Sequence, residues 1–180
     1  MKKAGILAAL CLGASAGFAM ALWFLATAAH AEEAPACAEF KWPLTVERSW
    51  FEAANSKELH SGAAVAEAVD GAFRIALKQS HEVAFVLLPE GKPKPDRPLG
   101  AVLTFGTVPM PGTYQVTLSD EAWIDVVQGF AYRPSIEFSE VNGCPGLRKS
   151  VRFEFKSAPL TLQLSSASAP SLKVAIKRVK

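Results

Sequence analysis

The sequence predicts an all-β fold, an antiparallel β-sandwich or jelly roll of eight or nine short strands with a short N-terminal helix. Two observations support this prediction. From residue 71 onward, apolar side chains take every second position in most segments, which is the period of a strand with one buried face. Clusters of glycine, proline, asparagine and serine separate these segments. Strands with one apolar face must stack on one another, so a sandwich follows, and an incomplete barrel is the alternative.

The clearest strand pattern flanks an acidic turn near the middle of the chain. Apolar residues alternate with polar ones through 112–119, from Tyr114 to Leu118, and 122–128 resumes the pattern after the turn at Asp120. The two segments are predicted to form a central hairpin on which the other strands are laid.

Six further segments are predicted strands because of their alternation or their composition: 73–77, 101–107, 135–139, 151–155, 160–165 and 172–176. The apolar run Val83–Leu88 predicts a ninth strand, buried on both faces. Pro89–Pro98 contains four prolines and several charges, so it is expected to form an exposed loop.

The segment 32–70 is expected to precede the β domain, which is assigned to 71–180. Within it, Thr45 is the expected cap of a helix over Val46–Ala54. The alanine-rich stretch Asn55–Gly71 is consistent with either a loop or a weak helix. Trp42, Trp50 and Phe51 lie close together here. They indicate either a binding platform or, as the favoured alternative, an aromatic plug over one end of the β core.

The first 31 residues have the features of an export signal. Lys2 and Lys3 precede an uncharged apolar run, and Ala29-His30-Ala31 fits a small-x-small cleavage site. A cleaved signal peptide predicts a periplasmic or secreted protein. The apolar run is long, so an uncleaved membrane anchor is the alternative, and it would be the only contact with a membrane.

Cleavage after Ala31 would leave one domain's length of chain with balanced charge. Without Lys2 and Lys3, 17 basic residues face 17 acidic ones. This balance argues against a nucleic-acid partner. The charge is uneven, because 32–70 is mainly acidic and 144–180 is mainly basic. The two ends are expected to neutralise each other in the fold. A basic face for an anionic envelope partner is the alternative.

Two cysteines, Cys37 and Cys144, follow the export segment. An even number of cysteines in an exported chain predicts a disulfide, and separate free thiols are the alternative. The bond would close a loop of about 107 residues, for which chain entropy predicts roughly 4–5 kcal/mol of stabilisation.

Enzymatic chemistry finds little support in the sequence. His60 and His81 lie in unrelated polar stretches without the H-x-D/E spacing of many iron sites, and no G-x-S-x-G or phosphate-binding glycine loop occurs. We predict no cofactor and no metal. Asp125 lies in an apolar strand on the same face as Trp123. Burial of its charge requires a partner, which makes it a structural anchor or, alternatively, a ligand-contacting acid.

The candidate partners of Asp125 are basic residues nearby in the sequence: Arg133, Arg148, Lys149 and Arg152.

Four motifs resemble a family of short exported alphaproteobacterial proteins with no defined activity: GTYQVTLS, AWIDVVQ, GCPGLRKSVRFEF and CAEFKWPLTVERSWF. The resemblance implies export. Some members of that family carry a homogentisate 1,2-dioxygenase label. The strand pattern is also similar, more distantly, to the pre-peptidase C-terminal β-sandwich domains of secreted enzymes.

Three functional hypotheses follow. The first is a non-enzymatic accessory or binding module for an envelope protein or glycan, acting through the aromatic segment (Trp42, Trp50, Phe51) or the basic residues Arg148, Lys149 and Arg152. The second is a sugar- or lipid-binding domain with Trp123 and Asp125 at its site. The third, ranked lowest, is a small metal-dependent oxygenase that uses His60 and His81.

Overall fold

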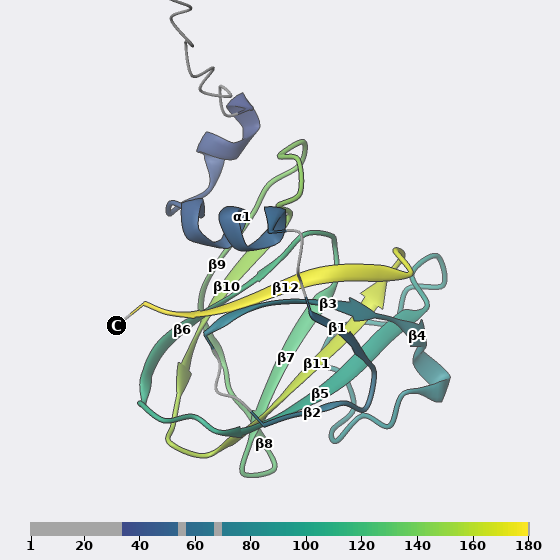
Figure 1. Ribbon diagram of the computed structural model, residues 1–180. Coiled ribbons are helices and arrows are strands. Elements are labelled where there is room, and N and C mark those ends of the chain that lie inside the picture. The colour runs from purple at the N-terminus through teal and green to yellow at the C-terminus, as the bar shows by residue number, and fades with distance from the viewer. Residues whose placement is uncertain (1–33, 54–56, 67–69, 180) are drawn as a thin grey trace, which may run out of the picture. The chain divides into compact units, whose positions relative to one another are not determined.

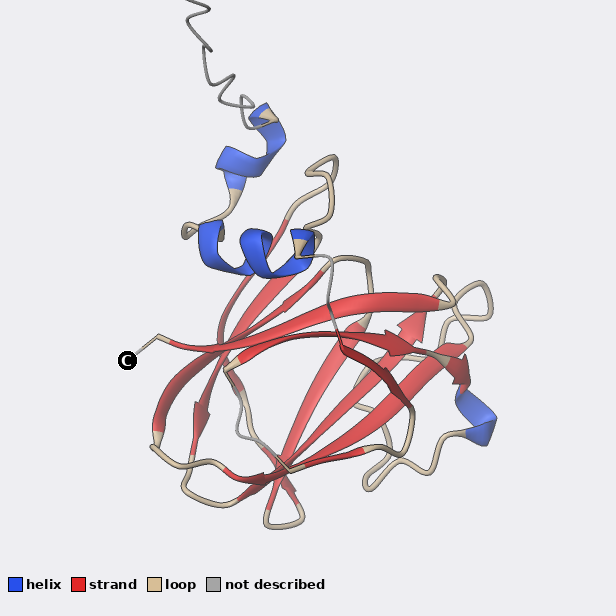
Figure 2. Ribbon diagram, in the orientation of Figure 1, coloured by secondary structure: helices blue, strands red, loops and turns tan. Residues whose placement is uncertain are grey.

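Two β-sheets stacked face to face form the fold, with one short α-helix beside them (Figures 1 and 2). The computed structural model describes residues 34–53, 57–66 and 70–179. The predicted signal peptide and its cleavage site lie outside these residues. The all-β sandwich with a short helix is therefore confirmed.

Sheet I has six strands in the order β1-β3-β12-β6-β10-β9. Their bounds are β1 Lys57–His60, β3 Gly71–Ala76, β12 Ser171–Arg178, β6 Gly112–Leu118, β10 Lys149–Phe155 and β9 Ser135–Glu140. Sheet II has the order β2-β5-β11-β7-β8, and β4 also pairs with β5. Its bounds are β2 Ala64–Val65, β5 Leu99–Thr107, β11 Pro159–Ala167, β7 Trp123–Gln128, β8 Ala131–Tyr132 and β4 Lys78–Gln79.

The predicted central hairpin is wrong in its pairing, although both of its strands exist. β6 pairs with β10 and β12 in sheet I, whereas β7 pairs with β11 and β8 in sheet II. The short connection through Asp120 therefore crosses from one sheet to the other, and a few extended residues suffice to span the roughly 10 Å between stacked sheets. Both strands still present their apolar face to the same core.

The alternating apolar residues of the two sheets meet in one core. Sheet I contributes Val116, Leu118 and Ile176 among others, and sheet II contributes Leu103 and Leu162 among others, all of them buried. Tyr114 and Phe155 stack within this core with their ring centroids 4.7 Å apart. The apolar residues at every second position, from which the fold was predicted, thus form the inward faces of the two sheets.

Residues 57–60 and 64–65 form two strands, so the prediction of a loop or a weak helix over Asn55–Gly71 is wrong in these two places. β1 pairs in parallel with β3, and β2 pairs in parallel with β5, so the two sheets are mixed and not purely antiparallel. Gly62, with φ of 94°, makes the turn between them. Both strands are short and lie at sheet edges, which explains why their sequence shows no strand period.

The segment 34–53, which we call the N-terminal roof, covers the outward face of sheet I. It consists of a 3₁₀ helix, Pro35–Glu39, and helix α1, Thr45–Glu52, which packs on β3 and β12 (Figure 1). The expected helix is confirmed with slightly different bounds. Thr45 is its first residue and not its cap; Leu44 occupies the cap position without a side-chain hydrogen bond.

Buried polar side chains attach the N-terminal roof to sheet I. Glu47 is completely buried, accepts a hydrogen bond from Gln115 Nε2 at 2.6 Å and pairs with Lys177 Nζ at 3.2 Å. Trp42 Nε1 donates to Ser150 Oγ at 3.1 Å. A buried carboxylate needs such partners, so the roof has one favourable position on the sheet.

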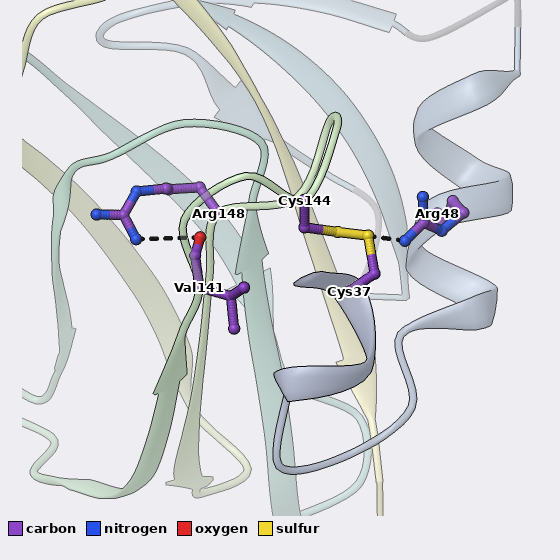
Figure 3. Close-up of a disulfide and its surroundings, with 5 residues drawn as sticks. All are labelled: Cys37, Arg48, Val141, Cys144 and Arg148. Carbon is purple, nitrogen blue, oxygen red and sulfur yellow. Dashed lines mark hydrogen bonds between the residues drawn. A yellow bond between two sulfur atoms is a disulfide. The ribbon is translucent and has the colours of Figure 1, made fainter. Parts of the chain in front are cut away.

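The disulfide between Cys37 and Cys144 joins the N-terminal roof to the loop after β9, as predicted (Figure 3). Its Cα atoms lie 4.8 Å apart and both cysteines are buried. Arg48 of α1 points at the bond and donates to Cys144 Sγ at 3.3 Å. The disulfide therefore reinforces a contact that buried polar groups already specify.

A second segment, loop 83–98, covers the outward face of sheet II. Its first part was predicted as the strand Val83–Leu88, which is wrong, because it forms no strand and Leu88 is 88% exposed. The backbone of this segment forms hydrogen bonds with a side chain and not with a neighbouring strand. Gln163 of β11 accepts from Val86 N at 2.7 Å and Leu87 N at 3.2 Å, and donates to Leu87 O at 3.0 Å.

Removal of the disulfide by the double change Cys37→Ser and Cys144→Ser is expected to lower the free energy of unfolding by about 2–5 kcal/mol, because the unfolded chain gains entropy. Urea unfolding of the oxidised protein, the reduced protein and the double variant measures this effect. If reduction leaves the midpoint unchanged, the cross-link does not stabilise the fold.

The Gln163→Leu change is expected to cost about 2–3 kcal/mol, because it leaves backbone groups of loop 83–98 without partners. Hydrogen exchange at the Val86 and Leu87 amides should increase selectively. Gln128→Leu is the matched control, since Gln128 holds the backbone of Lys156 and Ala158 in the same manner. Equal exchange at 86–87 in both variants would contradict the role of Gln163.

Candidate functional site

The aromatic residues of the N-terminal segment do not form an exposed platform. Trp42 and Phe51 are 7% and 3% exposed, and Trp50 is half-buried. The guanidinium of Arg152 lies 3.9 Å from the centre of the Trp42 ring. A ligand could not stack on Trp42 or Phe51 without displacing the N-terminal roof. These residues thus pack the roof onto the outward face of sheet I, whereas the predicted plug lay over one end of the β core.

Trp123 is the aromatic residue that combines exposure with a fixed orientation. It begins β7, its side chain is 43% exposed, and its Nε1 donates to Asp125 Oδ1 at 2.7 Å. The two residues share a face because they are two apart in one strand. The indole N–H, which is its single polar group, is therefore hydrogen-bonded to Asp125, and this bond fixes the orientation of the ring.

Asp125 is the anchor of this arrangement. Its side chain is only 3% exposed, and its Oδ2 accepts from the backbone N–H of Glu90 in loop 83–98 at 3.1 Å. The predicted hydrogen-bond anchor is found, but the anticipated cationic partner is not. Arg133, Arg148, Lys149 and Arg152 all contact other groups.

Burial raises the pKa of the Asp125 carboxyl above its usual value, the hydrogen bonds from Trp123 and Glu90 oppose part of that shift, and the nearby charge of Glu90 adds to it.

Gly91 packs against one side of the indole. A Cβ atom added at Gly91 would lie 2.4 Å from Trp123 Cγ, so a larger residue would displace either the ring or the loop. Lys149 Nζ lies 5.9 Å from the centre of the Trp123 ring on β10 of the other sheet. The indole is thereby held between loop 83–98 and the end of sheet I.

Two pockets meet at Trp123. One has a volume of about 330 Å³ and is lined by loop 83–98 together with Glu121 and Ala122. The other has a volume of about 270 Å³ and is mainly apolar, with Ile124, Phe138 and Val151 in its lining. Lys149 lines both. We call this combined hollow the Trp123 groove.

Charged side chains surround the Trp123 groove in a connected network. Arg148 pairs with Glu121 at 3.1 Å and with Glu140 at 2.6 Å, and Lys149 pairs with Glu140 at 3.3 Å. Arg97 also pairs with Glu121. The groove therefore presents both carboxylate acceptors and cationic donors beside an aromatic ring.

The predicted basic group does not form one patch. Lys149 lines the Trp123 groove and Arg148 pairs with Glu121 and Glu140 beside it, whereas Arg152 lies on the outward face of sheet I beside Trp42 and Gln115. Their positions in β10 explain this separation, because Lys149 and Arg152 are three apart and so face opposite sides of the sheet.

Sequence reasoning missed several residues of the Trp123 groove. Phe138, 58% exposed on the edge strand β9, and Glu140 both line it. Their alternation with Glu137 and Ser139 was a detectable signal of a shared face. Gly91 carried no such signal, because its role depends on the approach of a loop distant in sequence.

The two histidines are exposed and lie in different elements, His60 in β1 and His81 in a 3₁₀ helix of residues 80–82. Across residues 34–53, 57–66 and 70–179, no cluster of three His, Cys, Asp or Glu side chains suits a metal ion. Within the same ranges, no helix is sufficiently long and apolar to span a bilayer. No family model, curated protein or solved structure matched the chain.

The stability of the wild type relative to Asp125→Asn is expected to fall as the pH rises from 4 to 7. The folded pKa of Asp125 lies above its unfolded value near 3.9, so the stability gained from protonation is complete below that value and is lost as the pH rises through the folded pKa. The slope should not exceed about 1.4 kcal/mol per pH unit.

Urea unfolding of both proteins at each pH tests this expectation. Gln163→Leu, which changes no titratable group, is the control. A difference between wild type and Asp125→Asn that is constant with pH would show that burial does not raise the pKa of this carboxyl.

Proposed function

We propose that the chain is an exported, non-enzymatic binding module that takes a glycan at the Trp123 groove. The observation that carries this proposal is the half-exposed indole of Trp123, which is fixed by Asp125 and Gly91 at the junction of two pockets. A rigid aromatic ring loses little entropy when a ligand stacks on it. The apolar C–H face of a sugar ring is a suitable partner for such a surface.

The polar surroundings of the ring support a sugar over a purely apolar ligand. Glu121, Glu140 and Lys149 supply acceptors and a donor beside the indole. Sugar hydroxyls both donate and accept, so they can pair with such a mixed set without leaving a charge unpaired. The existing ion pairs hold these side chains in place before a ligand arrives.

Export is supported by the N-terminal charge and apolar pattern together with the disulfide. Cross-links of this kind persist in oxidising compartments outside the cytoplasm. A periplasmic or secreted location would bring the Trp123 groove into contact with envelope glycans.

The non-enzymatic assignment is supported by the chemistry of the Trp123 groove. Its lining contains no histidine or cysteine among the described residues, and its principal carboxylates, Glu121 and Glu140, are engaged in ion pairs with Arg148. A general base or nucleophile needs a group that is free to accept a proton or attack.

A glycan array probed with the purified protein, followed by calorimetric titration of the best ligand, tests the proposal. Trp123→Ala should weaken binding by about two- to tenfold, because it removes the stacking surface, worth on the order of 0.5–1.5 kcal/mol. Trp50→Ala, on the N-terminal roof, is the control and should bind as the wild type does. The proposal fails if no saccharide binds, or if Trp123→Ala binds as tightly as the wild type.

A further inference from the structure

A separate pocket of about 590 Å³ lies between loop 83–98 and the outward face of sheet II. Its volume falls in the range of small-molecule sites. Its walls are mainly apolar and include Phe85, Leu88 and the four prolines of the loop. We call it the proline pocket.

The loop that forms this pocket is held at several points along its length. Gln163 binds its backbone at 86–87, Asp125 binds Glu90, and Ser166 Oγ donates to Lys92 O at 3.1 Å. Tyr132 also donates to Leu88 O. Together with the fixed backbone angles of the prolines, these contacts make the pocket preformed.

Its floor carries an irregularity in β11. The pairing register of β11 with β5 shifts between Leu164 and Ala167, and Ser166 has a φ of 52°. A left-handed backbone is unfavourable for a serine, and bulges with such residues often lie beside functional sites. The bulge places two adjacent serines in the lining of the proline pocket.

Ser165 Oγ is a buried polar atom without a hydrogen-bond partner, and no other described side chain has such an atom. The residue is 5% exposed and lines the proline pocket. A buried hydroxyl without a partner is costly, and native proteins retain few of them. The atom has almost no accessible surface, so the side chain must turn toward the pocket before the acceptor atom of a ligand can bond to this hydroxyl.

The charges around the pocket favour an anion. The described lining includes Lys94 and Arg97 and no acidic residue. Lys94 and Arg97 share Glu121, and Arg97 also contacts the exposed Asp96. Neither carboxylate lines the pocket, so among the described charged side chains the pocket surface itself presents cations.

We propose that the proline pocket binds an apolar monocarboxylate of medium length, such as a fatty acid. The hydrocarbon chain lies against Phe85, Leu88 and the prolines. The carboxylate accepts a hydrogen bond from Ser165 Oγ and is stabilised by the basic lining residues. This site borders the Trp123 groove and shares Gly91, Lys94 and Ser166 with it, but it does not depend on glycan binding.

The experiment uses the purified full chain and the fluorescent probe 11-(dansylamino)undecanoic acid. Saturable binding of the probe and its displacement by sodium decanoate are expected. Decanol, which has the chain without the charge, should displace the probe at least about tenfold less effectively, because it lacks the charge-assisted interactions. Equal displacement by decanol, or no saturable probe binding, would overturn the proposal.

Ser165→Ala gives the sharpest test, since its effects on stability and affinity have opposite signs. It removes a hydroxyl without a partner, so the melting temperature should rise, while the affinity for decanoate should fall by about three- to tenfold. Ser150→Ala, which removes a hydroxyl bonded to Trp42 and Thr117, is the control. It should lower the melting temperature and leave decanoate binding unchanged.

Two results would overturn the role of Ser165. One is a Ser165→Ala variant that binds decanoate as the wild type does, and the other is an equal loss of binding in Ser150→Ala. Trp123→Ala should bind decanoate normally, which separates this site from the glycan site.

Discussion

Polar side chains buried on the outward faces of both sheets are the constraint on which this structure depends. Gln115, Thr117 and Ser150 in sheet I, and Asp125 and Gln163 in sheet II, are almost fully removed from solvent. Each requires hydrogen-bond partners, and neighbouring strands already use the backbone groups of the sheets. Some partners lie within the sheets, as in the Thr117–Ser150 pair, and the others come from the N-terminal roof over sheet I and loop 83–98 over sheet II. The sandwich is therefore covered on both sides, and polar contacts help to specify the position of each cover, together with apolar packing in the N-terminal roof.

This arrangement explains why both candidate sites lie beside loop 83–98. The N-terminal roof brings Trp42 and Phe51 into close packing with sheet I, and the disulfide secures it. Loop 83–98, in contrast, is rich in proline and lysine and contacts its sheet through single side chains such as Gln163 and Asp125. Because the side chains of this loop do not fill the space between the loop and the sheet, pockets remain between the points of attachment. The Trp123 groove and the proline pocket both border the same loop, which contributes Gly91 and Lys94 to both.

The sequence predicts the parts of this structure that follow from local alternation. The strands with one apolar face, such as 151–155, were found because burial of that face leaves a period of two. Pairing between strands leaves no comparable signal, so the crossing at Asp120 was mistaken for a hairpin. The apolar run Val83–Leu88 was mistaken for a buried strand because composition does not reveal that Gln163, about 76 positions later, replaces the neighbouring strand. Asp125 and Trp123 were recognised as neighbours, but their pockets depend on distant residues.

Ser165 differs from the other buried polar residues of the described chain, because its hydroxyl has no hydrogen-bond partner. In the described chain, buried side chains as demanding as Glu47, Asp125 and Gln163 all find partners across long sequence separations. A fold that meets these demands could have placed alanine at position 165, with no loss of packing and with a gain in stability. The hydroxyl instead lies in a strained bulge, beneath a preformed apolar pocket with basic residues in its lining. Sites that bind ligands commonly retain such unfavourable features, because the ligand supplies the missing interaction. This combination of features is the basis on which a ligand is proposed for the proline pocket.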